Sequence, residues 1–356
     1  MCSNKQLSRL LVCGTNFGRV YLKGIEKSNQ FSIAGILSKG SEQSKQVANE
    51  YGVPLYNDIK EIDKTMFDAA CVVVRSTVVG GKGSNIANQL LNKGISVLQE
   101  HPVHYNDLVK SLKIARENNC IYKINSFYPH VSSVHKFIKY GKKILDKSTP
   151  LYIDASCSIQ VLFPMIDILG ELLNGFRPWK LHAVEKGMES SPFSMVVGEI
   201  KGIPVTLKVQ NQIDPKDPDN NGMLLHRIVL GTSEGSLILT DSNGDVLWNP
   251  QMYVPHNEDG VLDMYGDNKY ISLPVTELIS NTCDMTYKNV YEDIWPLGIQ
   301  RALSNFEKLI KDKKAQTMQM QYQLTACQLW KEISDMLGKP QLVESNNRNA
   351  LTVNDI

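Results

Sequence analysis

The chain has 356 residues, of which 42% are hydrophobic and 21% charged, the composition of an ordinary globular protein with more than one domain. Its 38 Lys and Arg residues against 37 Asp and Glu give no charge excess that would favour nucleic acid or an anionic membrane as a partner. The first residues contain no apolar run long enough for a secretion signal or a membrane span, so we expect a cytoplasmic protein.

The first part of the chain alternates short apolar runs with helical patterns. Strands are predicted at residues 10–13, 31–37, 70–74, 97–100 and 121–124. Helices are predicted at residues 19–27, 42–51, 83–91 and 107–118. Because the strands are apolar throughout and alternate with helices, we predict an α/β fold with a doubly wound parallel sheet, a Rossmann domain over residues 1–125.

The pattern changes near Pro150, where β-branched runs separated by turn-rich segments take over. Strands are predicted at residues 151–155, 193–197, 205–209, 224–230 and 237–240. Helices are predicted at residues 164–173, 297–310 and 319–337. This indicates an α+β domain over residues 126–338 with a mostly antiparallel open sheet, followed by a loose polar tail at 339–356.

A glycine turn follows the first strand directly. It consists of Gly14, Thr15, Asn16, Phe17 and Gly18. Between a strand and a helix, such a turn can bind a pyrophosphate through backbone N–H groups and the helix dipole. The segment is not G-x-G-x-x-G, because Asn16 occupies the second glycine position and Gly18 comes one residue early. Its place favours a cofactor loop, with a plain structural turn as the alternative.

The end of the second strand lacks the acid that usually selects a dinucleotide without a 2′-phosphate. Ser38, Lys39, Ser41 and Ser44 lie there instead, at the start of a predicted helix. Hydroxyl groups, an ammonium group and a helix N-terminus can bind phosphate, so NADPH is the predicted cofactor. Glu42 is a counter-signal, although the helix dipole favours an acid at that position in any case.

Two further segments follow predicted strands of the same sheet. Arg75, Ser76 and Thr77 are expected to line the cofactor cleft, with a solvated loop as the alternative. Another strand ends in an acid, an imidazole and a proline at 100–102, where parallel sheets form their ligand crevice. Pro102 restricts the backbone before it. The alternative is a strand-to-helix turn in which Asn106 or Asp107 caps the next helix.

A Rossmann domain with a strand ending in Glu100, His101 and Pro102 resembles the glucose-fructose oxidoreductase, inositol dehydrogenase and rhizopine catabolism (Gfo/Idh/MocA) family, in which that motif is Glu-Lys-Pro. The aspartate and histidine that the family's sugar dehydrogenases use fall on Gln160 and Pro164 here, which argues against polyol oxidation. Four stretches are instead similar to the thiazolinyl imide reductases of siderophore biosynthesis, a branch of this family. They lie at residues 12–18, 73–81, 99–102 and 125–130.

This resemblance implies reduction of a thiazoline C=N to a thiazolidine by NADPH. The substrate would be tethered to a carrier domain of a nonribosomal peptide synthetase, as in yersiniabactin- or pyochelin-type pathways. Hydride addition leaves negative charge on nitrogen, so a proton donor is needed. His101, with an ordinary pKa of about 6.5, suits this role at neutral pH, and Tyr128, with an ordinary pKa of about 10, is the second candidate. Tyr128 could instead be a packing residue.

The remaining expectations concern binding and assembly. Glu100 and Pro102 are counted among the cofactor-binding residues. No cluster of His, Cys, Asp or Glu has metal-ligand spacing, so no metal is predicted. A homodimer is predicted through the exposed face of the second sheet, because apolar residues there need a cover. An NADP-dependent sugar or polyol dehydrogenase and a noncatalytic NADP-binding regulator are the alternative functions.

Overall fold

Six parallel strands form the first sheet of the computed structural model, which describes residues 7–76, 82–185, 191–265, 269–344 and 351–356. The strand order is β3-β2-β1-β4-β5-β6, so the predicted doubly wound sheet is confirmed. Its strands are β1 (Ser8–Cys13), β2 (Phe31–Leu37), β3 (Leu55–Tyr56), β4 (Ala69–Val72), β5 (Ser96–Glu100) and β6 (Tyr122–Asn125). The sheet is buried on both faces, which is why its strands are continuous apolar runs.

Four helices cover this sheet as predicted. They are α1 (Gly18–Glu26), α2 (Glu42–Glu50), α3 (Gly83–Asn92) and α4 (Tyr105–Glu117), with the 3₁₀ turn η1 (Ile59–Glu61). The start of α4 differs from the prediction, because its cap is neither Asn106 nor Asp107. His104 caps it, with Nδ1 accepting a hydrogen bond of 3.3 Å from the backbone N–H of Asn106.

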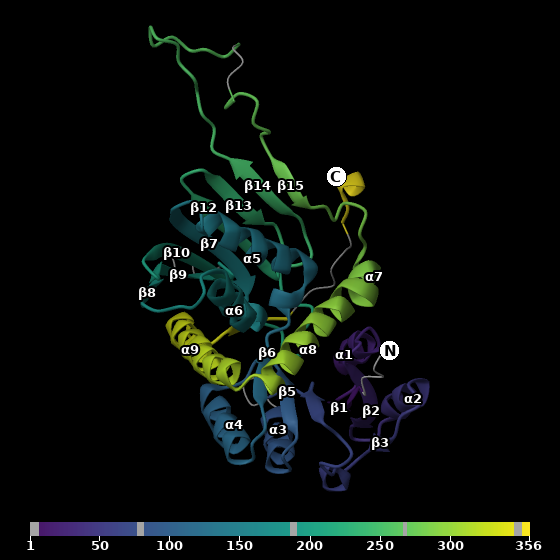
Figure 1. The fold of residues 1–356 in the computed structure, drawn as a ribbon. Coiled ribbons are helices and arrows are strands. Elements are labelled where there is room, and N and C mark those ends of the chain that lie inside the picture. Colours follow the sequence, from purple (N-terminus) through teal and green to yellow (C-terminus); the bar gives the residue numbers. More distant parts are fainter. Residues whose placement is uncertain (1–6, 77–81, 186–190, 266–268, 345–350) are drawn as a thin grey trace, which may run out of the picture.

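The second sheet has eight strands, in the order β15-β14-β13-β12-β7-β10-β9-β8. Its strands are β7 (Pro150–Ser158), β8 (Trp179–Val184), β9 (Phe193–Ile200), β10 (Ile203–Gln210), β12 (His226–Thr232), β13 (Gly235–Leu239), β14 (Val246–Pro250) and β15 (Glu277–Ser280). Neighbours are antiparallel except for the parallel pair β7 and β10, so the predicted mostly antiparallel sheet is confirmed. Helices α5 (Ser132–Leu145) and α6 (Leu162–Leu172) pack on one face of it (Figure 1).

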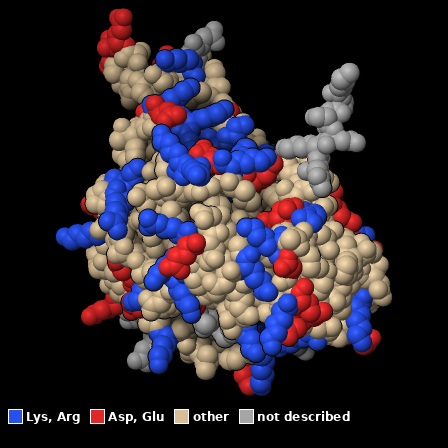
Figure 2. All heavy atoms as spheres, turned by 60° about the horizontal axis from the view of Figure 1, so that its bottom comes forward, with Lys and Arg blue, Asp and Glu red and all other residues tan. Residues whose placement is uncertain are grey.

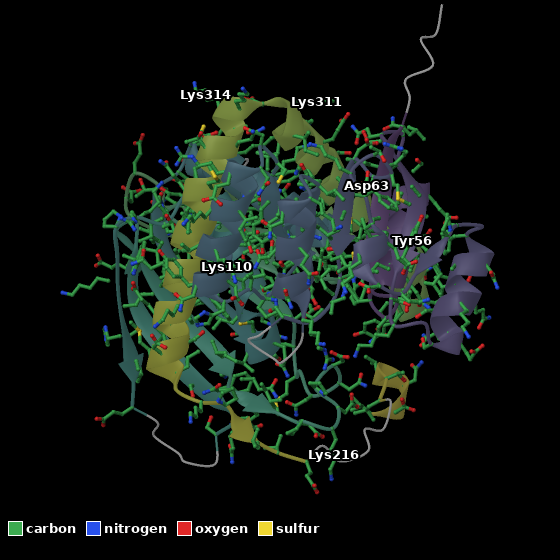
Figure 3. All side chains as sticks on the ribbon, turned by 90° about the horizontal axis from the view of Figure 1, so that it is seen from below. Tyr56, Asp63, Lys110, Lys216, Lys311 and Lys314 are labelled. Atoms are coloured by element: carbon green, nitrogen blue, oxygen red, sulfur yellow. The ribbon has the colours of Figure 1, made fainter. Side chains whose placement is uncertain are left out.

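Two long helices then return to the Rossmann sheet. After α7 (Tyr287–Asn289) and the π-helical turn η4 (Val290–Ile294), α8 (Trp295–Lys311) packs on α1, and α9 (Lys313–Leu337) packs on α4 and α6. Seen from below, α9 runs along one side of the molecule, and Tyr56 of β3 lies at the other side (Figure 3). None of the described helices is long and apolar enough to cross a bilayer.

The start of the tail is attached to the second half of the chain. A short strand, β16 (Gln341–Leu342), pairs with β11 (Gln212–Ile213), and Lys216 forms an ion pair of 2.7 Å with Glu344. A last 3₁₀ turn, η5 (Val353–Asp355), is exposed. The tail is therefore less loose at 341–344 than the sequence suggested.

The connection between β14 and β15 forms an arm. Its described residues, 251–265 and 269–276, project from the edge of the second sheet (Figure 1). Large apolar side chains on it are exposed to solvent, among them Met252, Tyr265 and Val275 at 83%, 94% and 89% of their maximum.

Candidate active site

The described residues predicted to bind a cofactor or act in catalysis lie at or near the carboxyl ends of β1, β2, β4, β5 and β6. β1 and β4 are neighbours, but the chain continues from β1 to β2 on one side of the pair and from β4 to β5 on the other. In doubly wound sheets this reversal opens the crevice in which a dinucleotide binds.

The turn after β1 requires glycine at its first position. Gly14 has a φ of +96°, and a Cβ built on it would lie 2.7 Å from the carbonyl oxygen of Val73. Asn16 is exposed, and Gly18 begins α1, which has no side-chain cap and no acid in its first turn. This arrangement fits the pyrophosphate of a dinucleotide.

Phe17, in the same turn, packs its side chain against two other aromatic rings. Its ring lies edge-on to the rings of Phe127 and Trp295, with centroids 5.7 Å from each. These contacts join the glycine turn to the turn after β6 and to the first residue of α8. The side chain of Phe17 therefore has a packing role, which the sequence did not indicate.

Hydroxyl groups connect the glycine turn to the end of β2. The Ser44 hydroxyl lies 2.9 Å from those of Thr15 and Ser41, and it is buried. Ser44 is thus occupied inside the protein rather than presented to a ligand. Lys39 is exposed and has no acidic partner among the described residues, and Ser38 is half-buried beside it. Lys39, Ser38 and Ser41 are the groups here that can reach a phosphate.

The segment after β4 connects to both halves of the chain. The guanidinium group of Arg75 forms an ion pair of 3.2 Å with Asp219, so the predicted lining residue bridges to a loop of the second half. The buried Ser76 donates a hydrogen bond to the backbone carbonyl of Pro102. Thr77 lies outside the described residues.

Glu100, at the end of β5, has a largely buried side chain, 14% exposed, whose carboxyl group accepts two hydrogen bonds. Tyr21 of α1 donates a hydrogen bond to its Oε2, and the amide of Asn125 lies 3.5 Å from the same atom. Burial raises the pKa of Glu100 to about 8, even though both hydrogen bonds act in the opposite direction. Glu100 therefore keeps its proton at neutral pH.

His101 follows with its ring stacked on Phe163, at a centroid distance of 6.2 Å. Nε2 lies 3.4 Å from Oε1 of Glu100, whereas Nδ1 is buried with no hydrogen-bond partner among the described residues. Burial, and to a smaller degree His226, lowers the pKa of His101 to about 3. The expectation that His101 titrates near neutral pH is wrong for this conformation, because the ring is neutral there.

Tyr128 is positioned by a tight turn after β6. Phe127 has a φ of +63° and a ψ of −57°, and the N–H of Tyr128 donates to the carbonyl of Ser126 at 2.7 Å, which makes a γ-turn. The Tyr128 ring lies 6.2 Å from that of His101. Burial raises the pKa of Tyr128 well above its usual range, so the hydroxyl stays protonated. It has no hydrogen-bond partner within the described ranges.

His226 of β12 also belongs to the site, although no role could be assigned to it from sequence. Its ring lies 4.7 Å from that of Tyr128, with Nδ1 2.7 Å from the Ser242 hydroxyl and Nε2 2.9 Å from the carbonyl of Val161. A carbonyl only accepts, so Nε2 carries the proton and Nδ1 accepts from Ser242. Burial lowers the pKa of His226 to about 4, and the neutral ring packs against Tyr128.

The other residues discussed from sequence have separate places. Gln160 donates from its amide to the carbonyl of Pro218 at 3.3 Å, and its Oε1 is buried without a partner among the described residues. Pro164 is buried in α6. His130 is buried, and its carbonyl accepts a hydrogen bond from Arg301.

The site's chemistry follows from these protonation states. Glu100, Tyr128 and the neutral His101 ring each carry a proton at neutral pH. Among the described residues, no ion pair or hydrogen bond joins a lysine, or any carboxyl group except that of Glu100, to His101 or Tyr128. Removing a proton from an alcohol requires a stronger base than this site provides. The arrangement is better suited to giving a proton to a substrate than to taking one.

Comparisons with known proteins agree with this architecture. The family model described as an oxidoreductase family with an NAD-binding Rossmann fold matches residues 8–126. A second model, described as the C-terminal part of Irp3-like thiazolinyl imine reductases, matches residues 148–249. No curated protein matches the sequence.

Solved structures share the fold at low sequence identity. An oxidoreductase from Agrobacterium radiobacter, solved with NAD⁺, L-tartaric acid and magnesium, has a TM-score of 0.65 at 10% identity, covering 92% of this chain and 95% of that one. A dehydrogenase from Chromobacterium violaceum has a TM-score of 0.64 at 10% identity, over 93% and 96%. Myo-inositol 2-dehydrogenase from Lactobacillus plantarum has a TM-score of 0.61 at 12% identity, over 95% and 100%.

Proposed function

We propose that this chain, which belongs to the Gfo/Idh/MocA oxidoreductase family and carries an Irp3-like C-terminal domain, reduces a thiazoline C=N bond to a thiazolidine with NADPH. The observation that carries the proposal is the pairing of that domain with His101 and Tyr128, two neutral groups that each carry a transferable proton and whose rings lie 6.2 Å apart. Polyol oxidation is disfavoured because His101, Gln160 and Pro164 stand where the family's sugar dehydrogenases have lysine, aspartate and histidine.

The residues after β1 and β2 would hold the cofactor. Gly14 and the N-terminus of α1 fit the pyrophosphate, and Ser38, Lys39 and Ser41 offer a 2′-phosphate hydroxyl groups and a positive charge. This supports NADPH over NADH. NADPH held there would supply the hydride that the imine carbon needs.

The proton for the imine nitrogen would come from the pair formed by Glu100 and His101. The protonated carboxyl of Glu100 faces Nε2 of His101, so the neutral ring holds its own proton on Nδ1, which has no hydrogen-bond partner in the described part of the protein. His101 can give the Nδ1 proton to the substrate and take the Glu100 proton on Nε2, and it then remains neutral. Tyr128 can donate directly or hold a water molecule.

The substrate we propose is carried by a synthetase carrier domain in siderophore biosynthesis, of the yersiniabactin or pyochelin type. This part of the proposal rests on the Irp3-like domain. A cytoplasmic location is consistent with the six described cysteines, which are all free thiols, five of them buried.

We also propose a homodimer. Helices α5 and α6 cover only one face of the second sheet, and outward-facing side chains such as Tyr152 and Met195 are 40% and 38% exposed. The described residues of the arm, 251–265 and 269–276, add further uncovered apolar surface at the edge of the same sheet. Light scattering should give about twice the 39.9 kDa monomer mass at micromolar concentration, and a monomer mass would refute the dimer.

One assay separates the reductase from its alternatives. The purified protein is mixed with NADPH and a thiazoline thioester, and separately with NADP⁺ and a panel of sugars and polyols. A reductase consumes NADPH and releases the thiazolidine only in the first mixture. Turnover in the second alone would indicate a polyol dehydrogenase, and cofactor binding without turnover in either would indicate a regulator.

A further inference from the structure

A groove of about 430 Å³ lies between α5, the loop after β15, the turn η4 and helix α8. Glu100, His101 and Tyr128 do not line it. The proposed reaction gives it no role, so its lining is the only guide to what it binds.

All four ionisable side chains that line the groove are basic. They are His135, Lys136 and Lys139 of α5, and Arg301 of α8. Figure 2 shows Lys and Arg side chains gathered toward the top of its view, with fewer acidic ones among them. A hollow lined by one sign of charge attracts ions of the opposite sign.

These cations lack the acidic partners that surface cations usually have. Lys136 and Lys139 are exposed, and no acid pairs with either among the described residues. Arg301 donates to the carbonyl of His130 at 2.8 Å and to the Ser132 hydroxyl at 3.2 Å, neither of which balances its charge. The pKa of His135 is lowered by burial and then by Arg301 and Lys139. A bound anion would relieve this repulsion.

Apolar side chains from the segment that leads into α8 also line the groove. They are Met285, Val290 and Ile294. A free inorganic anion would use only the basic side, whereas a phosphate ester with a slender organic chain would use both. The groove thus matches a ligand that is anionic at one end and neutral along its length.

The groove shares a wall with the turn that carries Tyr128. Val290 and Ile294 line it from η4, and Tyr291 of that turn lies edge-on to Trp295, with ring centroids 5.0 Å apart. Trp295 in turn packs on Phe127, at 5.5 Å. Phe127 precedes Tyr128, so a series of packed rings links the wall of the groove to the turn that carries Tyr128.

We infer that this groove binds the phosphopantetheine arm of the carrier domain, with Lys136 and Lys139 contacting its phosphate and the η4 side contacting the pantetheine chain. The inference rests on the proposed function for the identity of the substrate, but its binding step needs no chemistry. It assigns a delivery site to a partner that otherwise has no place on the molecule.

Calorimetric titration of the whole protein with phosphopantetheine, pantetheine and inorganic phosphate tests the groove. The double variant Lys136→Gln, Lys139→Gln should bind phosphopantetheine about tenfold more weakly or worse, as expected for lost charge-assisted hydrogen bonds. Lys113→Gln, an equal change of an exposed lysine on α4, should bind like wild type. Lys136→Arg, Lys139→Arg keeps the charge and should also bind, which controls for loss of folding.

Two outcomes would overturn the inference: equal binding by the double Gln variant and wild type, or inorganic phosphate binding as tightly as phosphopantetheine. Kinetics separate it from the proposed function. The double Gln variant should raise KM for a carrier-tethered thiazoline about tenfold and leave turnover of a free thioester unchanged. If no thiazoline is reduced but lysine-dependent binding persists, the proposed function is wrong and the groove assignment stands.

Discussion

Oε1 of Glu100 lies 3.4 Å from Nε2 of His101, and burial shifts the pKa values of the two groups in opposite directions. The pKa of Glu100 rises to about 8 and the pKa of His101 falls to about 3. At neutral pH the carboxyl group therefore holds the proton and the ring is neutral. Both groups of the pair are therefore uncharged, and the pair still has a proton to donate. That property suits a site that must protonate a nitrogen as hydride arrives.

The raised pKa of Glu100 predicts a pH dependence of stability. The folded state holds the Glu100 proton up to about pH 8, whereas the unfolded state loses it near the ordinary value of 4.5. The free energy of unfolding should therefore fall as pH rises between these values, by roughly 2 kcal/mol from pH 6 to pH 8. Chemical denaturation at the two pH values measures this contribution.

Glu100→Gln should remove that contribution, since the amide does not titrate. The buried histidines are common to both proteins and cancel when the two are compared. Glu117→Gln, at an exposed position on α4, should keep the wild-type slope. Equal slopes for Glu100→Gln and wild type would show that the Glu100 carboxyl is already charged in the folded protein.

Lys39 should determine the choice of cofactor. Wild type should bind NADPH more tightly than NADH. Lys39→Ala should weaken NADPH binding by about 10- to 100-fold, the size of a charge-assisted hydrogen bond, and leave the affinity for NADH unchanged. Lys23→Ala, which removes an exposed lysine of α1, is the matched control. Fluorescence titration of the three proteins with each cofactor gives the six dissociation constants. Equal or tighter NADH binding by wild type would exclude the preference.

Gly14 and Gly52 both have positive φ values, of +96° and +62°, but only Gly14 has a near neighbour. An alanine at either site costs roughly 1 to 2 kcal/mol of backbone strain. Gly14→Ala also drives its Cβ against the carbonyl of Val73. Thermal denaturation should show a larger loss for Gly14→Ala, and only that variant should lose NADPH binding. If it binds NADPH like wild type, the turn is not the pyrophosphate site.

Much of the fold follows from the sequence because its strands are either buried on both faces or alternate clearly. The predicted strand at 31–37 matches β2 at both ends. Edge strands were missed: β8 and β15 are largely exposed, so no apolar pattern marks them. Helix α5 was also missed, and it starts without a side-chain cap to signal it.

The proximity of His101 and Tyr128 was predictable, because each follows the carboxyl end of one of two neighbouring parallel strands, β5 and β6. The remainder depends on tertiary packing. His226 contacts Tyr128 because β12 pairs with β7, and no local sequence pattern predicts that strand pairing. Burial likewise gives His101 a pKa far from its ordinary value, and burial depends on the folded packing around the ring.

Single substitutions should separate the two proton donors. If His101 gives the proton, His101→Ala should lower kcat by about 10² to 10⁴ and leave NADPH affinity nearly unchanged. If Tyr128 gives it, Tyr128→Phe should show that loss instead. Mild single variants with a severe double variant would point to a water held by both groups, because residues that act as a unit are not additive.

The most direct test of the account is the rate at which the double variant His101→Ala, Tyr128→Phe reduces a thiazoline thioester under saturating NADPH. With NADPH binding intact by titration, kcat should fall by at least about 10² relative to wild type, the lower end of a general-acid contribution. A double variant that forms thiazolidine at the wild-type rate would contradict the account, because neither residue would then supply the proton.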